Sequence, residues 1–137
     1  MKVMAIDYGD ARTGVAISDL TCSIVGTTTV IHQRNRQLVA QEIDALIRAN
    51  AVGELVVGFP KNMDGTEGPR AEIYREFAGV LRETTGLEPV LWDERRTTVD
   101  AHRILSENNF HGKKRKNTVD AVAASLILEG YLSFRSR

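Results

Sequence analysis

The sequence has 137 residues, enough for one domain with a buried core and too few for two full domains. Hydrophobic residues make up 42% and charged residues 26%, an ordinary globular composition, and the formal net charge is zero. One cysteine excludes an internal disulfide framework, and three separated histidines beside it match no zinc pattern. No apolar run reaches the ~18 residues of a membrane span, and the first apolar run meets Asp7 too early for a signal peptide. We therefore expect a single domain over residues 1–137, soluble and cytoplasmic, with no membrane partner.

The charge is divided unevenly along the chain. Residues 1–94 hold 9 Lys and Arg against 14 Asp and Glu, a net of −5, whereas residues 95–137 hold 9 against 4, a net of +5. Such a split is typical of proteins that bind a polyanion through one segment, and it also occurs where a solvated surface is simply uneven. Charge alone therefore leaves a nucleic-acid partner open.

The first part of the chain predicts three strands, a helix and a fourth strand. Apolar and β-branched runs predict strands over 3–6, 15–18 and 26–31, the first two joined as a hairpin. From residue 35 the apolar spacing becomes helical, with Val39, Ile43 and Ile47 on one face. The run 55–59 predicts the fourth strand, which ends before a polar loop over 61–69.

The rest of the chain predicts helices with one more strand between them. The predicted elements are a helix over 70–84 that Gly86 ends, a strand over 89–92, a helix over 98–107, a polar basic segment over 110–117 and a final helix over 119–132. Three meandering strands followed by crossover units predict an α/β fold with a five-stranded mixed sheet flanked by helices.

Carboxylates stand at the ends of two predicted strands and at the start of the last helix. Asp7 follows the first strand, Asp93 and Glu94 follow the fifth, and Asp120 lies one residue into the final helix. If strands one and five are close, Asp7 meets Asp93 or Glu94 at the sheet edge where α/β folds usually place their sites. The final helix could then bring Asp120 over the same place. Any one of these acids alone could be a surface residue or a helix cap.

Clustered carboxylates are the ligands that hard divalent cations such as Mg²⁺ prefer. Such ions activate a water molecule and stabilise the leaving oxygen of a phosphodiester. Without a metal, clustered acids repel and raise each other's pKa. The arrangement therefore favours metal-dependent phosphodiester cleavage.

Basic and polar residues near these acids are candidates for substrate binding. They are Lys113, Lys114, Arg115, Lys116, Arg95 and Asn62. The basic run precedes Asp120 by about one turn and would hold phosphates without reading bases. Arg95 can fork onto a phosphate, and Asn62 lies in the glycine-punctuated loop after the fourth strand. A basic run or a polar loop is also compatible with a plain solvated surface.

Four short motifs occur in an order that resembles one known family. They are Ile6-Asp7-Tyr8-Gly9 with Gly14-Val15-Ala16, Val57-Gly58-Phe59-Pro60 with Asn62-Met63-Asp64-Gly65, Asp93-Glu94-Arg95 with Thr97-Thr98, and Val119-Asp120 with Ala123-Ala124. Together they resemble the YqgF family, also described as RuvX-like Holliday junction resolvases and as pre-16S rRNA nucleases. The resemblance covers essentially the whole chain.

The resemblance implies a ribonuclease H-like fold and phosphodiester cleavage that depends on Mg²⁺ or Mn²⁺. It implies Asp7, Glu94 and Asp120 as catalytic acids and metal ligands, with Asp93 beside them. Because adjacent side chains on a strand point to opposite faces, one of Asp93 and Glu94 should face away. Two positions depart from the family pattern: Arg96 replaces an apolar residue, and Asp10 adds an acid in the first turn.

Three functions follow from these expectations. The first is processing of the 5′ end of pre-16S ribosomal RNA, with a ribosomal particle as a possible partner. The second is resolution of branched DNA, which would suit a symmetric homodimer. The third is a non-catalytic RNA-binding ribosome-assembly factor that keeps the acids without using them. A sugar-kinase or actin-like ATPase also opens on such a hairpin, but it needs two such lobes, for which this chain is too short.

Overall fold

Three strands at the N-terminus build one half of the sheet. In this computed structural model β1 (Lys2–Asp7), β2 (Arg12–Ser18) and β3 (Val25–His32) form an antiparallel meander. The structure describes residues 1–59, 68–93 and 112–135, with only the backbone over 112–118. Within these ranges, no helix has the length and apolar character needed to cross a membrane.

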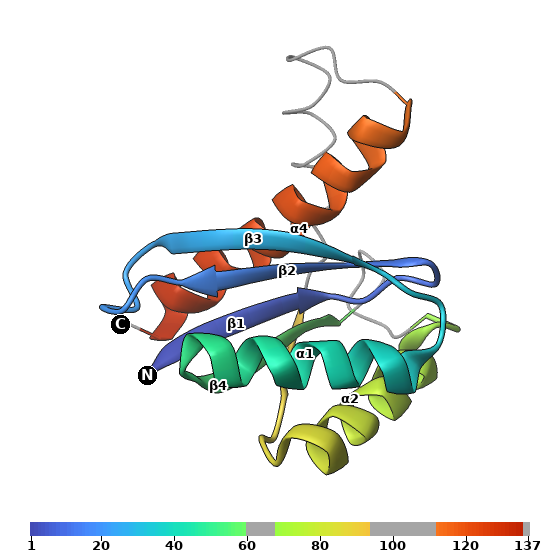
Figure 1. Cartoon of the computed structure of the whole chain (residues 1–137), viewed down its shortest axis with the longest axis horizontal. Helices are drawn as coiled ribbons and strands as arrows, with labels where there is room; N and C mark the ends of the chain where they lie inside the picture. Colours follow the sequence, from blue (N-terminus) through green and yellow to red (C-terminus); the bar gives the residue numbers. More distant parts are fainter. Residues whose placement is uncertain (60–67, 94–111, 136–137) are drawn as a thin grey trace.

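Two further strands complete the sheet in parallel with β1. β4 (Val52–Phe59) pairs with β1, and β5 (Val90–Asp93) pairs with β4, so the order is β3-β2-β1-β4-β5 (Figure 1). The predicted five-stranded mixed sheet is confirmed. The condition that the first and fifth strands are close is met only with one strand between them. The β1–β2 hairpin leaves one edge of β1 free, and β4 pairs with that edge.

Helices cover both faces of this sheet. α1 (Arg36–Asn50) and α2 (Ala71–Thr85) lie on one face, and α4 (Gly112–Arg135) lies on the other (Figure 1). The side chain of Asn35 caps α1 by accepting a hydrogen bond of 3.1 Å from the Leu38 N–H. Gly86 ends α2 in the left-handed conformation, with φ of 77°, as the sequence predicts.

Alternation along the strands fills a separate core on each face. On β1, Met4 and Ile6 point towards α1 and α2, whereas Val3 and Ala5 point towards α4. β1 is therefore apolar on both sides, as a strand buried in the middle of a sheet is. This alternation also decides the face on which each residue at a strand end lies.

The last helix begins earlier than the sequence predicts. It starts at Gly112 rather than at residue 119, so residues 112–117 form its first turns instead of a loop. Lysine and arginine are good helix formers, and no glycine or proline interrupts residues 113–129. In Figure 1 these first turns extend beyond β3. The predicted helix over 98–107 and most of the predicted loop over 61–69 lie outside the described residues.

The C-terminal half of α4 is anchored to the sheet by polar and aromatic contacts. The Tyr131 hydroxyl donates a hydrogen bond to the Glu54 carboxylate on β4, and Arg135 Nε donates to the same carboxylate at 3.0 Å. The Trp92 ring on β5 meets Tyr131 edge to face, with ring centroids 5.5 Å apart. These contacts fix the line along which α4 crosses the sheet.

Candidate active site

Asp7 ends β1 at the edge of the sheet where the β1–β2 turn begins. It continues the alternation of Val3 and Ala5, so its side chain lies on the α4 face. Across the antiparallel pair it stands beside Gly14 of β2. Because Asp7 faces α4 and its cross-strand neighbour is a glycine, a residue of α4 can approach it.

Gly14 allows α4 to come very close to the sheet at this point. A Cβ atom on Gly14 would lie 2.1 Å from the backbone oxygen of Asp120 and 2.7 Å from its carbonyl carbon. No side chain fits such a space, so glycine is needed here for close backbone approach. Because Gly14 is the cross-strand neighbour of Asp7, this packing brings Asp120 next to Asp7.

Arg12 holds the Asp120 side chain. Its Nε donates a hydrogen bond of 3.0 Å to Oδ2 of Asp120, and the two side chains are 34% and 20% exposed. His32 is the cross-strand partner of Arg12 and adds a further electrostatic interaction with Asp120. The sequence gives neither Arg12 nor His32 a role at this site, since nothing local links them to a residue about ninety or more positions away.

Burial and neighbouring charges shift the pKa values of both carboxyls. Burial, together with the negative charge of Asp120, raises the pKa of Asp7 to about 7. Burial also raises the pKa of Asp120, while the hydrogen bond and charge of Arg12 oppose that shift. Burial is the larger cause for both acids, and the charge of Asp120 adds to it at Asp7. A bound cation would offset both effects.

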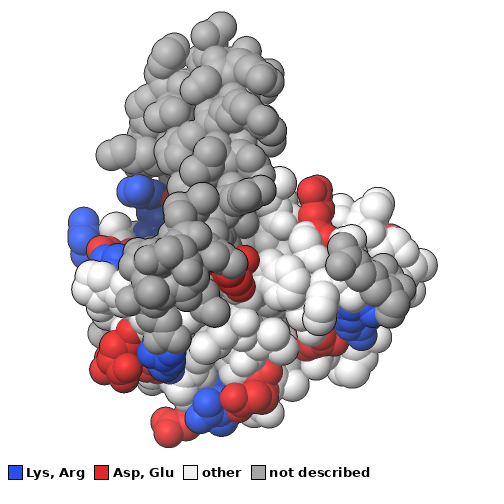
Figure 2. Space-filling model, turned by 180° about the vertical axis from the view of Figure 1, so that it is seen from behind, with Lys and Arg blue, Asp and Glu red and all other residues white. Residues whose placement is uncertain are grey.

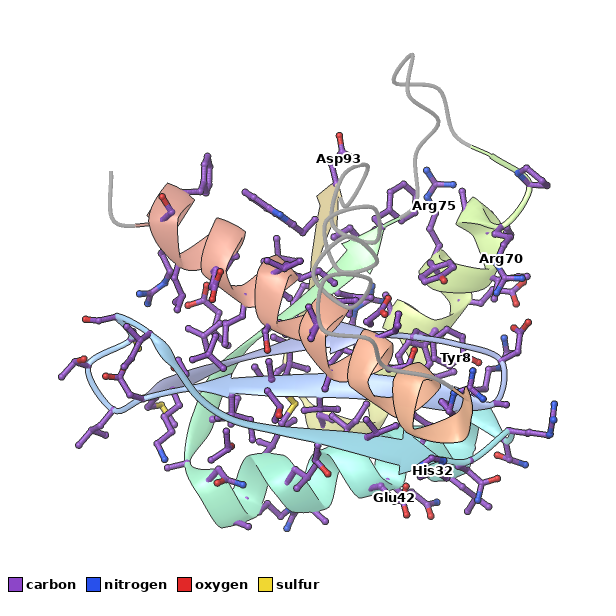
Figure 3. All side chains as sticks on the ribbon, turned by 90° about the horizontal axis from the view of Figure 1, so that it is seen from above. Tyr8, His32, Glu42, Arg70, Arg75 and Asp93 are labelled. Carbon is purple, nitrogen blue, oxygen red and sulfur yellow. The ribbon has the colours of Figure 1, made fainter. Side chains whose placement is uncertain are left out.

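Asp93 does not join this pair. In the parallel register it stands beside Phe59, whose side chain lies in the core under α1 and α2, whereas its neighbour Trp92 packs towards α4. Asp93 therefore lies on the face opposite to Asp7, with β4 between their strands. Figure 3 shows Asp93 at the tip of β5, across the breadth of the sheet from His32. Of the four predicted acids, the described structure brings together Asp7 and Asp120.

The turn after β1 packs on aromatic rings of α2. Tyr8 stacks on Phe77 with centroids 3.9 Å apart, and the Tyr74 hydroxyl donates a hydrogen bond of 2.9 Å to the Tyr8 backbone oxygen. Asp10, the unusual acid in this turn, forms an ion pair of 3.0 Å with Arg70. The turn that positions Asp7 therefore rests on α2.

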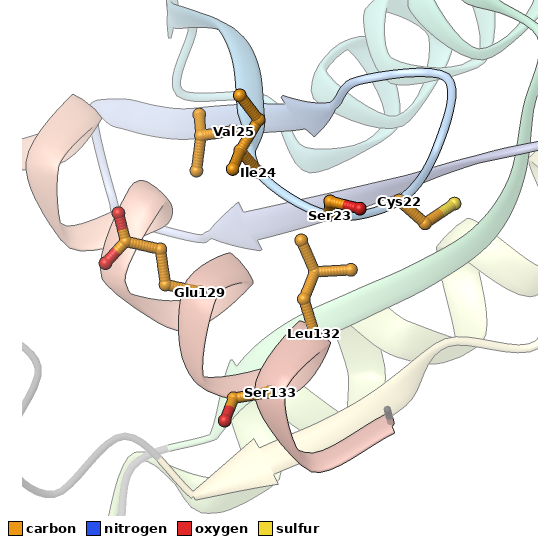
Figure 4. A pocket seen from close by; sticks show the side chains of 7 residues that line it. All are labelled: Cys22, Ser23, Ile24, Val25, Glu129, Leu132 and Ser133. Atoms are coloured by element: carbon orange, nitrogen blue, oxygen red, sulfur yellow. The ribbon is translucent and has the colours of Figure 1, made fainter. Parts of the chain in front are cut away.

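A separate cavity lies away from the acid pair. It has a volume of about 390 Å³ between the β2–β3 turn and the C-terminal turns of α4 (Figure 4). Its lining residues are Cys22, Ser23, Ile24, Val25, Glu129, Leu132 and Ser133. The β2–β3 turn is at the opposite end of the strands from Asp7, so this cavity is not part of the candidate site.

Comparison with known proteins identifies the family. The sequence model described as "RuvX: Holliday junction resolvase" matches residues 1–134. The chain belongs to the RuvX family. Two relatives, from Carboxydothermus hydrogenoformans and Halothermothrix orenii, are 43% and 44% identical to this RuvX-family chain over 137 residues. The alignments cover all of this chain and 99% and 98% of those proteins, and both carry the name "Putative pre-16S rRNA nuclease".

Solved structures show the fold of this RuvX-family chain. Thermus thermophilus RuvC in complex with a Holliday junction matches with a TM-score of 0.63 and 11% identity, covering 99% of this chain and 96% of RuvC. The fowlpox virus resolvase bound to Holliday junction DNA matches with a TM-score of 0.58 and 15% identity over the full length of both chains. The expected ribonuclease H-like fold is confirmed.

The acid pair of this RuvX-family chain has the donor chemistry of a divalent-cation site. Among the described residues, no three acids, histidines or cysteines gather to hold a metal ion. Asp7 and Asp120 nevertheless offer hard oxygen ligands, and a cation would favour the charged forms that burial opposes, with the charge of Asp120 adding to this at Asp7. The donor chemistry of Asp7 and Asp120 therefore fits a hard divalent cation, and Glu94, the third predicted acid, lies outside the described residues.

The described surface does not by itself account for the expected attraction to a polyanion. Figure 2 shows one face of the molecule, seen from behind relative to Figure 1, and acidic and basic side chains are interspersed over its described part. The positive excess of the chain is carried by residues 95–137, of which side chains are described from residue 119 to residue 135. Arg95, Asn62 and the side chains of Lys113–Lys116 lie outside the described residues, so their substrate roles stay predictions.

Proposed function

We propose that this chain is a divalent-metal-dependent nuclease that processes the 5′ end of pre-16S ribosomal RNA. The observation that carries the proposal is the meeting of Asp7 and Asp120 at the end of β1, where α4 crosses Gly14. The names of relatives more than 40% identical over the whole chain support the substrate. Such a precursor is carried by an assembling ribosomal particle, which is therefore the proposed partner.

Asp7, Asp120 and Glu94 would hold Mg²⁺ or Mn²⁺. Asp93 lies on the α2 face, so strand alternation favours its neighbour Glu94 as the third ligand. When bound there, the ion would supply an activated water and stabilise the leaving oxygen of the phosphodiester. The chain's own contribution is orientation: β1 fixes Asp7, and close packing at Gly14 fixes the backbone of Asp120.

The first turns of α4 would hold the phosphates of the substrate. Lys113–Lys116 precede Asp120 by four to seven residues on one continuous helix, about 6–10 Å along its axis. Cations at that distance can bind phosphates on either side of the cleaved bond without reading the base sequence. Arg95 and Asn62 are the further phosphate-binding candidates.

The test is a cleavage assay with a matched pair of variants. Wild type, Asp7→Asn and Asp44→Asn are incubated with a 5′-extended 16S precursor fragment, with Mn²⁺ and with chelator. Asp44 is also a partly buried, ion-paired aspartate, 3.1 Å from Arg48, but it lies on α1. We expect metal-dependent cutting that Asp7→Asn abolishes and Asp44→Asn retains. Equal cutting by wild type and Asp7→Asn would refute the proposal.

Resolution of branched DNA is the second candidate function. The description of the family supports it, and it would use the same acids in a symmetric homodimer. A four-way DNA junction in the same assay tests it, because paired cuts placed symmetrically about the crossover would favour resolution over RNA processing. If neither substrate is cut and Asp7→Asn binds RNA as wild type does, a non-catalytic assembly factor replaces both proposals.

A further inference from the structure

A positively charged side chain already contacts Asp120, one of the two acids. The Arg12 guanidinium lies 3.0 Å from one oxygen of Asp120, and the pair is only partly exposed. Arginine stays protonated at every accessible pH, so this charge cannot be titrated away. A divalent ion that used Asp120 as a ligand would therefore have to approach a carboxylate already in contact with a cation.

The ion pair is not needed to bring Asp120 to the sheet. The Asp120 backbone is already packed on β2 through Gly14. Further along α4, Tyr131 and Arg135 form hydrogen bonds with Glu54 and fix the helix at the opposite end of the strands from Asp7. What Arg12 adds is charge: its guanidinium compensates the partly buried Asp120 carboxylate, which itself stands beside Asp7.

We propose that Arg12 is the resident counter-ion of Asp120 in the metal-free protein, and that a divalent cation replaces it. The inference rests on the metal site of the proposed function. A monovalent and a divalent cation touching the same carboxylate repel each other strongly in a partly desolvated site. Arg12 therefore lowers the affinity for metal and turns away from Asp120 when metal binds. In return, the negative charge of Asp120 is partly compensated while no metal is bound.

The first test measures metal affinity after the counter-ion is removed. Mn²⁺ is titrated calorimetrically into wild type, Arg12→Gln, Arg12→Lys and Arg48→Gln, at about pH 8, where an ordinary histidine is neutral. Arg48 is the matched control because its Nε also donates to an aspartate Oδ2, at 3.1 Å, on the exposed surface of α1. We expect Arg12→Gln to bind Mn²⁺ about tenfold more tightly or better and to melt at a lower temperature without metal. Arg12→Lys keeps the charge and should not gain affinity, and Arg48→Gln should match wild type.

Tighter binding is a result that structural damage would not produce. The gain should vanish when Arg12→Gln is made in an Asp120→Asn background, since the competition acts through that carboxylate. Unchanged or weaker Mn²⁺ binding by Arg12→Gln would overturn the counter-ion role. If wild type bound no Mn²⁺, the metal site of the proposed function would fail, and this inference with it.

A second measurement needs no substitution. The Arg12 Nε–H resonance should be protected from solvent exchange by Asp120 in metal-free wild type. Adding Mg²⁺, which is diamagnetic, should remove that protection as the site fills. A resonance that stays protected at saturating Mg²⁺ would show that Arg12 and the metal bind Asp120 at the same time. That result would contradict the proposal that the metal replaces Arg12.

Discussion

At the scale of single residues, Asp7 makes the metal-free protein less stable at neutral and alkaline pH. Its pKa rises from 3.8 to about 7 on folding, mainly through burial and then through the charge of Asp120. An acid whose pKa is raised on folding stabilises the native state fully only below its unfolded pKa, and this contribution is lost as pH rises to about 7. We predict that Asp7→Asn is more stable than wild type at about pH 8 by on the order of 2–4 kcal/mol.

Urea unfolding in the presence of chelator, repeated across the pH range, measures this difference. The advantage of Asp7→Asn should shrink as pH falls towards 4, where the wild-type carboxyl is protonated in both states. Asp44→Asn is the control substitution, because Asp44 lies apart from the acid pair, on α1, in an ion pair with Arg48. A constant difference between Asp7→Asn and wild type at all pH values would contradict the burial argument.

Gly14 gives a second prediction at the residue scale. A Cβ there would overlap the Asp120 backbone at 2.1 Å, so Gly14→Ala must push α4 away from the sheet. We expect a loss of about 1–3 kcal/mol in stability and a loss of metal-dependent cleavage. Gly79→Ala is the matched control: a Cβ at Gly79 meets nothing within 4 Å, and alanine in α2 should stabilise by about 0.5–1 kcal/mol. Normal cleavage by Gly14→Ala would contradict the close approach.

The sequence predicts candidate acids but not the contacts between them. Asp7 and Asp120 are recognisable because each stands at the end of a strand or the start of an apolar helix. Arg12 is not recognisable in this way, because its partner is 108 residues away in the chain. The choice between Asp93 and Glu94 also depends on strand register, which places Asp93 beside Phe59 and so on the face opposite to Asp7.

At the scale of elements, the direction of α4 depends on its C-terminal anchor. Burial and the neighbouring Glu54 raise the pKa of Tyr131 to about 12, so its hydroxyl stays a donor under all ordinary conditions. We predict that Tyr131→Phe costs about 1–2 kcal/mol, because the partly buried Glu54 carboxylate loses one of its two donors while the ring packing against Trp92 is kept. Urea unfolding followed by the fluorescence of Trp92, the single tryptophan, measures it.

Arg135→Gln provides the comparison for this anchor. Arg135 reaches the same Glu54 carboxylate from a more exposed position, so its loss should cost less than about 1 kcal/mol. Equal costs for the two variants would mean that the charge on Glu54, rather than the buried hydroxyl, holds the helix.

Element positions follow from periodicity wherever the pattern is apolar. The strand beginning near Val3 and the helix with Val39 and Ile43 on one face were recognisable for that reason. The first turns of α4 were not, because Lys113–Lys116 have no apolar face to reveal the helical period. Their helical propensity is nonetheless high, so continuity with the apolar part of α4 extends the helix to Gly112.

At the scale of the whole molecule, chain order gives the sheet type but not the neighbours. A meander followed by crossover units predicts a mixed sheet, and the sheet is mixed. Which edge each crossover strand joins depends on long-range packing, and here β4 separates β1 from β5. The consequence for the site is that α4, rather than β5, brings the second acid of the described pair to Asp7.

The division of charge along the chain leads to a prediction about binding. The molecule has no net charge, so any strong attraction to nucleic acid must come from its positive segment, residues 95–137. Each cation that contacts a phosphate releases counter-ions and adds about 0.7–0.9 to the slope of log affinity against log salt concentration. Replacing all four cations of Lys113–Lys116 with glutamine should therefore reduce that slope by about three.

Fluorescence anisotropy with a labelled precursor RNA fragment, over a series of salt concentrations with chelator present, measures the slope. The control variant replaces Lys2, Arg48 and Arg82, three cations at the end of the sheet away from Asp7, and should leave the slope almost unchanged. An equal reduction in both variants would mean that binding follows total charge and is not localised. A slope unaffected by either variant would exclude the first turns of α4 as the phosphate contact and transfer that role to Arg95 and its neighbours.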